Sequence, residues 1–235
     1  MGEKFVNFPI FYFAVGMVIV VNSAQKTLIL LAGAPGTGKS YTGRIIMRAF
    51  PFLIYTPLDM FKEHIYDEIG FDNLEQKKVL DEEARERFYR AVELMMSYKK
   101  QILCDYPFSY KQKPHLKSIA KKNDYQVITV RLEAPVDILY WRQRNRDQED
   151  PRHLGHLMNH YHRDDILESN TKFDGMPSIE TFEKRMKDRG YANFSLGKLL
   201  RVNVSNYSQI DYSRLINTLE KLIGITPLPV NNKGN

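Results

Sequence analysis

The stretch LILLAGAPGTGKSYT at residues 28–42 decides the fold class of this chain. An apolar run typical of a buried strand stops at a loop that contains Gly33, Gly36 and Gly38 and ends in Lys39 and Ser40. Glycine permits backbone conformations closed to other residues, so successive N–H groups of such a loop can point at one anion. The lysine adds a cation, the serine a hydroxyl for Mg²⁺, and the following helix the partial positive charge of its N-terminus.

This pattern, G-x-x-x-x-G-K-[ST] between a strand and a helix, predicts a nucleoside triphosphate site. A glycine-rich turn with a chance lysine is the alternative, which the flanking strand and helix signals disfavour. We expect the loop to bind ATP and Mg²⁺, with Lys39 also acting in catalysis. The residues assigned to nucleotide binding are Gly33, Ala34, Pro35, Gly36, Thr37, Gly38, Lys39, Ser40 and Tyr41.

Composition limits what the chain does with the nucleotide. Its 235 residues, 43% hydrophobic and 26% charged, are enough for one α/β domain with a sizeable core. The single cysteine, Cys104, excludes an intrachain disulfide and lies in an apolar run, which favours a buried structural thiol. A net charge of +6 and a pI near 9.2 suit a polyanionic partner. Because a triphosphate pocket also gathers Lys and Arg, a nucleic-acid partner stays possible without being favoured.

The apolar run FVNFPIFYFAVGMVIVV, residues 5–21, has three interpretations. It is a short membrane anchor, an element packed on the domain, or an extension upstream of a natural start at Met17. We reject a signal peptide as a further interpretation, because it would export a protein whose main motif needs intracellular nucleotide. We favour an extension or packed element at 1–25, a domain at 26–224, a flexible tail at 225–235 and a cytoplasmic location.

Beyond the loop, strand and helix patterns alternate. This alternation predicts a mostly parallel sheet with helices on both faces and ligands at the carboxyl ends of the strands. Strands are expected at 52–56, 101–105, 125–133 and 198–205, and helices at 40–50, 75–99, 114–123, 135–146 and 211–224.

Two aspartates come at the ends of expected strands. Asp59 follows the second strand, where it is either a helix N-cap or a general base that takes the proton of an acceptor hydroxyl. Asp105 ends the third strand, where it holds Mg²⁺ together with Ser40 or simply forms a turn.

Arginines form the third candidate group, since Arg142, Arg144, Arg146 and Arg152 lie within eleven residues. On a helix, Arg142 and Arg146 share a face and suit the neutralisation of a transferring phosphate, although a solvated basic face is the alternative. The polar segment at about 146–165 resembles a lid that excludes water. Its four histidines lack the partners that a zinc site would need.

Four segments together resemble one family. The loop, PLDMFKEHIYDEIGF (57–71), ILCDYPF (102–108) and VDILYWRQRNRDQEDPRHLGH (136–156) are similar to small P-loop kinases of the group that contains chloramphenicol phosphotransferase and zeta-toxin-like kinases, many labelled AAA-family ATPases. The similarity covers most of residues 26–223. It implies a three-layer P-loop NTPase sandwich with five parallel strands in the order 2-3-1-4-5.

The resemblance also implies roles for residues. Lys39 and Ser40 correspond to the phosphate lysine and the magnesium hydroxyl, Asp59 to the general base, and Arg142 and Arg146 to lid arginines. The segment 203–207 would border the adenine. One departure is that the third strand ends in CDYPF without two adjacent carboxylates, which leaves the role of Asp105 in doubt.

We therefore expect an ATP-dependent phosphotransferase that acts on a hydroxyl of a small molecule. Residues 60–75 and 106–113 are expected to line the acceptor pocket. An ATP-driven switch and a kinase for nucleic-acid ends are the alternatives. The sequence predicts neither the acceptor nor the oligomeric state.

Overall fold

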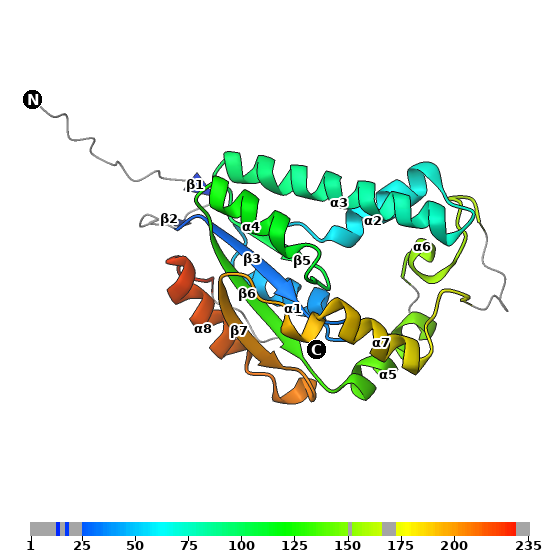
Figure 1. Ribbon diagram of the computed structural model, residues 1–235. Coiled ribbons are helices and arrows are strands. Elements are labelled where there is room, and N and C mark those ends of the chain that lie inside the picture. Colours follow the sequence, from blue (N-terminus) through cyan, green and yellow to red (C-terminus); the bar gives the residue numbers. More distant parts are fainter. Residues whose placement is uncertain (1–12, 15–16, 19–24, 150–151, 166–172, 229–235) are drawn as a thin grey trace, which may run out of the picture.

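The computed structural model describes residues 13–14, 17–18, 25–149, 152–165 and 173–228 (Figure 1). A five-stranded sheet forms its centre, and each neighbouring pair of strands is parallel. Across the sheet the strands are β4 (Ile54–Tyr55), β5 (Ile102–Asp105), β3 (Thr27–Ala32), β6 (Gln126–Glu133) and β7 (Lys198–Asn203). Numbered along the chain, these strands lie in the order 2-3-1-4-5, which confirms the fold that the sequence predicts.

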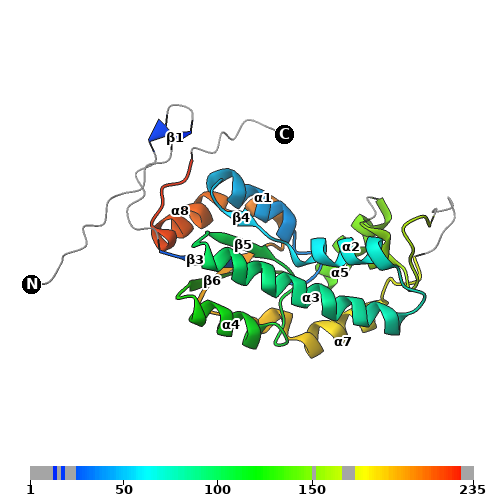
Figure 2. The same cartoon turned by 90° about the horizontal axis from the view of Figure 1, so that it is seen from above.

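Helices cover both faces of the sheet, as Figures 1 and 2 show. Helices α3 (Leu74–Ser97) and α4 (Lys113–Lys122) pack on one face, and α1 (Lys39–Ala49) and α8 (Tyr212–Ile223) pack on the other. The alternation of side chains along β3 sends Leu28 and Leu30 into the first layer and Ile29 and Leu31 into the second. This two-sided burial explains why the strand is an uninterrupted apolar run.

Most expected elements are present within two residues of their predicted ends. The strand expected at 52–56 is shortened most, because only Ile54–Tyr55 (β4) pair in the sheet. Helix α2 (Leu58–Ile69) follows β4, and α5 (Val136–Glu149) extends beyond its expected end. Two helices were not predicted, α6 (Leu154–Leu157) and α7 (Ile179–Arg189). Helix α7 buries only Phe182 and Met186, so its apolar pattern is weak in the sequence. Short 3₁₀ turns lie at Tyr191–Asn193 and Tyr207–Gln209.

Residues 13–14 and 17–18 form the antiparallel strands β1 (Phe13–Ala14) and β2 (Met17–Val18). The interpretations of the apolar run at 5–21 concern residues that lie largely outside the described ones. In the part of the chain that the structure describes, no helix is both long and apolar enough to cross a membrane. The lone thiol, Cys104, is buried in the first layer of the core, as predicted.

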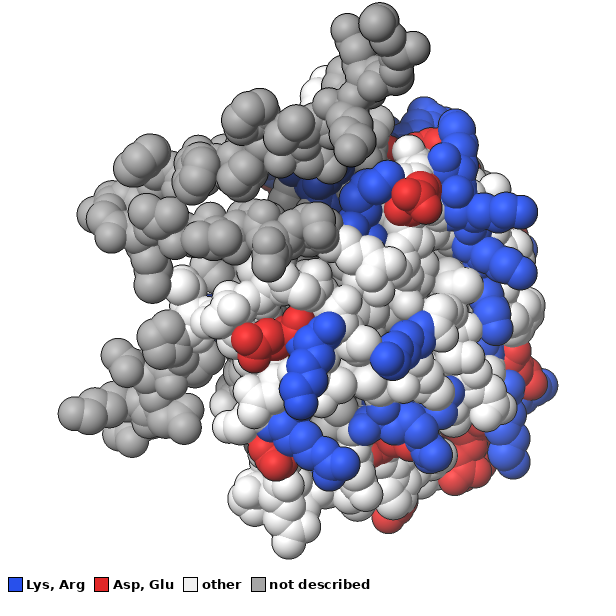
Figure 3. Space-filling view, turned by 90° about the vertical axis from the view of Figure 1, so that its left-hand side faces the viewer, with Lys and Arg blue, Asp and Glu red and all other residues white. Residues whose placement is uncertain are grey.

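The five parallel strands of the central sheet all begin at one end of the molecule, which Figure 3 shows in space-filling form. Most charged side chains on the described part of this end are Lys and Arg. The loop at 33–38 lies at the opposite end, where the parallel strands finish. Ligand sites of open α/β sheets lie at this carboxyl end, so the search for the site begins there.

Candidate active site

The loop between β3 and α1, residues 33–38, depends on glycine for its shape. Gly33, Gly36 and Gly38 have φ angles of 144°, 85° and 79°, which side chains with a Cβ rarely adopt. Gly36 also lies against α5, because a Cβ added there would collide with the backbone oxygen of Leu139. The loop is therefore compact and is held between the sheet and α5.

The carbonyl oxygen of Ala34 organises the inside of this loop. It accepts hydrogen bonds from Thr37 Oγ1 at 2.8 Å and from Lys39 Nζ at 3.0 Å. The lysine thus folds back over the loop from the first residue of α1. Tyr41, two residues further along the helix, is exposed beside the same loop.

The pKa of Lys39 is shifted by four charged residues near its ammonium group. Burial lowers the pKa of Lys39, while Asp105 and Asp59 oppose that shift. Arg146 and Arg152 lower the pKa further. Because such effects fall off with distance, two carboxylates and two guanidiniums share the surroundings of this ammonium group.

Asp105, the last residue of β5, lies beside the start of α1. One of its carboxylate oxygens accepts hydrogen bonds from Ser40 Oγ at 3.0 Å and from Tyr55 at 2.8 Å. Burial raises the pKa of Asp105, and the charge of Lys39 acts against that rise. A hydroxyl and a carboxylate are oxygen ligands of the kind that Mg²⁺ prefers, so this pair fits the ion chemically. The magnesium role of both residues stays a prediction.

Asp59 lies in the first turn of α2 and not at its N-cap, which is Pro57. The N-cap interpretation is therefore wrong, because the helix begins one residue before Asp59. Burial raises the pKa of Asp59, but the positive charges of His156 and Lys62, among others, lower it below its ordinary value. The carboxylate is therefore ionised at neutral pH and available as a proton acceptor.

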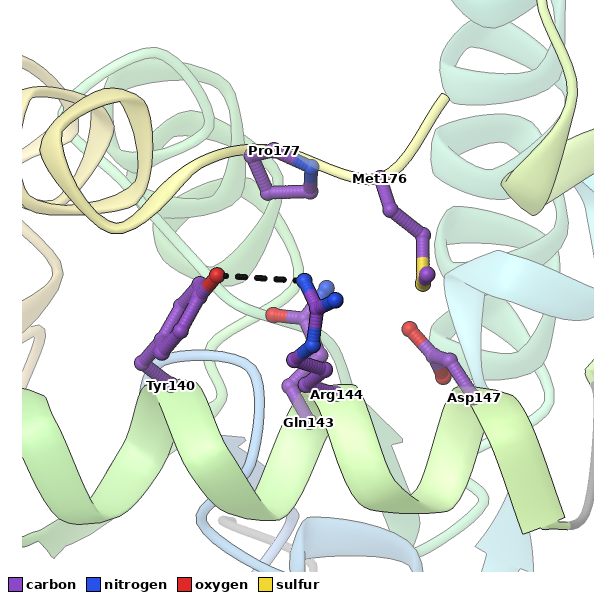
Figure 4. Close-up of a pocket in the computed structure, with 6 residues that line it drawn as sticks. All are labelled: Tyr140, Gln143, Arg144, Asp147, Met176 and Pro177. Carbon is purple, nitrogen blue, oxygen red and sulfur yellow. Dashed lines mark hydrogen bonds between the residues drawn. The ribbon is translucent and has the colours of Figure 1, made fainter. Parts of the chain in front are cut away.

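Asp147, on α5, holds two arginines together. Its side chain is 1% exposed, accepts a hydrogen bond from Arg146 Nε at 2.9 Å and lies 3.3 Å from Arg152 Nε. Figure 4 shows this side of α5, where Asp147 and Gln143 face the segment at 176–177 across a narrow gap and Arg144 donates to Tyr140 at 3.3 Å. The arginines near Lys39 are thus fixed by a buried carboxylate.

Arg142 makes different contacts from Arg146, although one turn of α5 separates them. It donates to the backbone oxygen of Val204 at 2.6 Å, and its guanidinium lies 3.8 Å from the ring centroid of Tyr207. The Tyr207 hydroxyl in turn donates to the backbone oxygen of Gly36 at 3.1 Å. The structure therefore joins Arg142 to the segment expected to border the adenine and does not place it with Arg146.

A pocket of about 400 Å³ opens beside Asp59. Pro35 of the loop and Asp59 both line it, so the space extends from the nucleotide loop outward. The expected segments contribute Lys62, Tyr66 and Tyr106, among others, while α3, α5, α7 and the residues around α6 contribute the remaining walls. Lys and Arg supply seven of the lining residues and Asp three, so the pocket is predominantly basic.

Within the expected lid at 146–165, residues 146–149 belong to α5 and residues 152–165 pack on α2. A backbone bridge joins Tyr161 to Phe71, and the Tyr161 hydroxyl donates to Asp67 at 2.6 Å. Three histidines pair with carboxylates of α2 and the turn after it: His153 with Asp67 at 2.9 Å, His156 with Glu63 at 3.0 Å and His162 with Asp72 at 2.8 Å. No group of three or more His, Cys, Asp or Glu among the described residues is placed to hold a metal ion.

Comparison with known proteins identifies the family. A sequence model of the zeta toxin family matches residues 17–172, more than half of the chain. This chain belongs to the zeta toxin family. The zeta toxin match includes the nucleotide loop, both aspartates and the arginines of α5, and it ends before α7. No curated protein sequence matches the chain.

Solved structures share the fold of this zeta toxin family member. A protein from Chloroflexus aurantiacus J-10-fl that is proposed to be a kinase aligns with a TM-score of 0.66 and 21% identity, over 83% of this chain and 97% of that one. A tunicamycin resistance protein from Deinococcus radiodurans aligns with a TM-score of 0.51 and 15% identity, over 86% and 98% of the two chains. A gluconokinase from Sinorhizobium meliloti 1021 gives 0.50 and 13%, over 85% and 98%. At these identities the likeness shows the P-loop kinase fold.

Some residues of the site were missed by the sequence analysis. Tyr55 and Asp147 bond directly to predicted site residues, and a carboxylate within an arginine-rich stretch was the available signal for Asp147. The arginines of α7 that line the pocket belong to no motif and lie beyond the zeta toxin match. Only the folded chain brings them to the site.

Proposed function

We propose that this protein is an ATP-dependent kinase that transfers the γ-phosphate of ATP to a hydroxyl group of a small molecule. The observation that carries the proposal is the position of Asp59. Its ionised carboxylate lies close enough to Lys39 to oppose the lowering of the pKa of that lysine by burial, and it also lines the adjoining 400 Å³ pocket. A proton acceptor between a nucleotide loop and a pocket is the arrangement that phosphoryl transfer to a hydroxyl needs.

The nucleotide would bind along the loop at 33–38, with Lys39 at its phosphates and Tyr207 and Arg142 toward the base. Ser40 and Asp105 would hold Mg²⁺, which neutralises phosphate charge when it is bound. These assignments rest on the loop geometry, the Ser40–Asp105 hydrogen bond and the stacking of Arg142 on Tyr207. The domain at 26–224 with a lid at 146–165 is part of the same proposal, and a cytoplasmic location stays a prediction.

In the transfer step, the acceptor hydroxyl in the pocket attacks the γ-phosphorus while Asp59 takes its proton. The bond from the γ-phosphorus to the bridging oxygen breaks, so that ADP leaves and a phosphate ester forms. Arg146 and Arg152, held by Asp147, supply positive charge that stabilises the negative charge developing in the transition state of the transfer. The residues around α6 line the pocket, and as a lid they would limit the access of water during transfer.

The test measures ATP consumption by the purified protein with Mg²⁺, alone and with pooled cell metabolites. We expect metabolites to stimulate turnover, and Asp59→Asn to reduce the stimulated rate by about 10²–10⁴-fold while ATP still binds, since general bases contribute that much. Lys39→Ala should instead weaken ATP binding at least about 10-fold. The matched control is Asp137→Asn, an exposed aspartate in the first turn of α5. If the rate of ATP consumption is the same with and without metabolites and the same in the wild type and Asp59→Asn, an ATPase switch is supported in place of a kinase.

A further inference from the structure

Asp105 is held by two hydroxyl groups that bond to the same carboxylate oxygen. Its Oδ2 accepts hydrogen bonds from Ser40 Oγ at 3.0 Å and from the Tyr55 hydroxyl at 2.8 Å. Among the described residues, no side chain or backbone group donates to the other oxygen, Oδ1. Asp105 is only 5% exposed, and a buried carboxylate is stabilised mainly by such bonds. The two bonds therefore fix one oxygen and leave the acceptor positions of the other unused.

The bond between Ser40 and Asp105 sets the direction of the serine hydroxyl. Ser40 is the second residue of α1 and follows Lys39 directly. Since the hydroxyl proton of Ser40 goes to Asp105, the lone pairs of its oxygen are left for another partner. A serine that donates to a fixed carboxylate is thereby oriented to bind a cation through its oxygen. The position of Asp105 therefore matters for both members of the proposed magnesium pair.

Tyr55 reaches Asp105 from the neighbouring strand. Strand β4 pairs with β5, and Tyr55 lies opposite Leu103, two residues before Asp105. The amide groups of the residues before and after Tyr55 both donate to backbone oxygens of the segment 101–103, each at 2.8 Å. The backbone on either side of Tyr55 is therefore fixed to the strand that ends in Asp105.

A glycine of α1 leaves room for the ring of this tyrosine. Gly43 is buried, and a Cβ added there would lie 3.3 Å from Tyr55 Cε2 and 3.4 Å from the Tyr55 hydroxyl oxygen. Glycine inside a helix is destabilising relative to alanine, so the close approach of the ring explains its presence at this position. The helix that begins with the nucleotide-binding residues Lys39 and Ser40 therefore also accommodates Tyr55.

Packing does not require the hydroxyl group of Tyr55. The side chain is half-buried, and together with Arg44, Met47 and Arg48 it borders an open space of about 370 Å³. A phenylalanine would fill the same position, because the ring and not the hydroxyl supplies the apolar contact. The bond to Asp105 is therefore what the hydroxyl adds.

We infer that Tyr55 is a positioning residue of the magnesium site: its hydroxyl holds Asp105 Oδ2, so that Oδ1 and the Ser40 oxygen stay available to the ion. The inference rests on the proposed function through its magnesium site alone and is independent of the acceptor. Hydrogen-bond partners of metal-binding side chains set the orientation of those side chains, and their loss typically costs about 10–100-fold in metal affinity. Tyr55 acts through Asp105 and does not itself touch the ion.

The first test measures the dissociation constant of Mn²⁺, as a probe for Mg²⁺, from the complex of the protein with a non-hydrolysable ATP analogue. The protein is in excess over the analogue, and the electron paramagnetic resonance signal reports free Mn²⁺. The constant should rise about 10-fold or more in Tyr55→Phe, while the affinity for the analogue in EDTA stays unchanged. The matched control, Tyr212→Phe, should leave both unchanged, because the Tyr212 hydroxyl lies 3.3 Å from Thr42 Oγ1 of the same helix and not beside Asp105.

The outcomes separate the inference from the function on which it rests. Equal Mn²⁺ constants in the wild type and Tyr55→Phe overturn the inference and leave the magnesium site standing. A Tyr55→Phe variant that loses affinity for the analogue in EDTA to the same extent also overturns it, since the residue would then support the whole loop. If the wild-type complex binds Mn²⁺ no more tightly than the free analogue does, the proposed magnesium site is refuted and the inference fails with it.

The second test is a double-mutant cycle that asks whether Tyr55 acts through Asp105. Asp105→Ala removes the carboxylate, so Tyr55→Phe should change the Mn²⁺ dissociation constant less than about 2-fold when it is added to Asp105→Ala. The same loss of about 10-fold in both backgrounds would show that Tyr55 acts by another route, which overturns the inference. All four proteins are compared below their melting temperatures, which melting curves determine.

Discussion

Lys77, a pocket residue of α3, shows how the fold changes the chemistry of a single side chain. Its ammonium group donates to the backbone oxygen of Met158 at 2.9 Å and lies 5.2 Å from the centroid of the Phe71 ring. Burial lowers the pKa of Lys77 to about 8, although Asp81 acts in the opposite direction. Part of the positive charge of the pocket is therefore lost as the pH rises through about 8.

This shift predicts how stability depends on pH. Between about pH 8 and 10.5 the unfolded chain binds the Lys77 proton more tightly than the folded protein does, so folding is favoured as the pH rises. Relative to Lys77→Met, the wild type should gain about 1 kcal/mol after allowance for partial exposure, or about 2–4 °C in melting temperature. Melting curves at several pH values measure this, with Lys78→Met as the control for loss of one charge. A constant difference between wild type and Lys77→Met would contradict the lowered pKa.

At the scale of elements, the contact between α2 and residues 152–165 joins the proposed lid to a wall of the proposed acceptor pocket. Asp67 of α2 accepts from the Tyr161 hydroxyl at 2.6 Å and pairs with His153 at 2.9 Å. The amide of Tyr161 donates to the backbone oxygen of Phe71 at 2.7 Å. One carboxylate thus joins two side chains of the segment that also carries Arg152 and its neighbours into the pocket.

Asp67→Ala should loosen this segment without unfolding the protein. Loss of two hydrogen bonds should speed amide exchange in residues 153–162 by about 10-fold or more, since each contributes about 0.5–1.5 kcal/mol. Hydrogen exchange with mass spectrometry measures the effect. The matched control is Glu68→Ala, because Glu68 pairs with Arg87 of α3 at 2.9 Å and not with the lid segment. Equal exchange in both variants would show that Asp67 does not hold the lid segment.

At the scale of the whole molecule, the sheet separates two apolar layers and fixes where its carboxyl ends meet. The central strand β3 lies between β5 and β6, and Leu30 in that strand is 0% exposed. The nucleotide loop begins at residue 33, directly after β3 ends at Ala32. A cavity under this strand would therefore also loosen the base of the loop. The stability of the core and the geometry of the site are thus connected through one strand.

Leu30→Ala should lower the free energy of unfolding by about 2–5 kcal/mol, the usual cost of a cavity at a fully buried leucine. The matched control is Leu94→Ala on α3, where the side chain is 59% exposed and the expected change is about 0.5 kcal/mol or less. Urea unfolding of both variants provides the comparison. Similar losses in the two would mean that β3 is not the centre of the core.

How far the sequence predicts the site depends on whether its residues are neighbours along the chain. The nucleotide loop was readable because its glycines, Lys39 and Ser40 lie within one short segment. Helical spacing also placed Arg142 and Arg146 on one face, yet they bond to Val204 and Asp147 respectively. Periodicity gives the direction of a side chain, whereas its partner depends on which distant segments pack nearby.

The sequence by itself determined the alternating α/β architecture and the phosphate-binding loop, because both follow from local backbone chemistry and from apolar periodicity. Its resemblance to zeta-toxin-like kinases also implied the strand order that the sheet has. Only the tertiary structure decided the remaining walls of the pocket, which come from α3, α5, α7 and the residues around α6 and join the two segments that the sequence predicted. The electrostatic surroundings of a residue depend on distances in space. A local sequence pattern contains no such distances, so it does not predict that α7 and Asp59 line the same pocket.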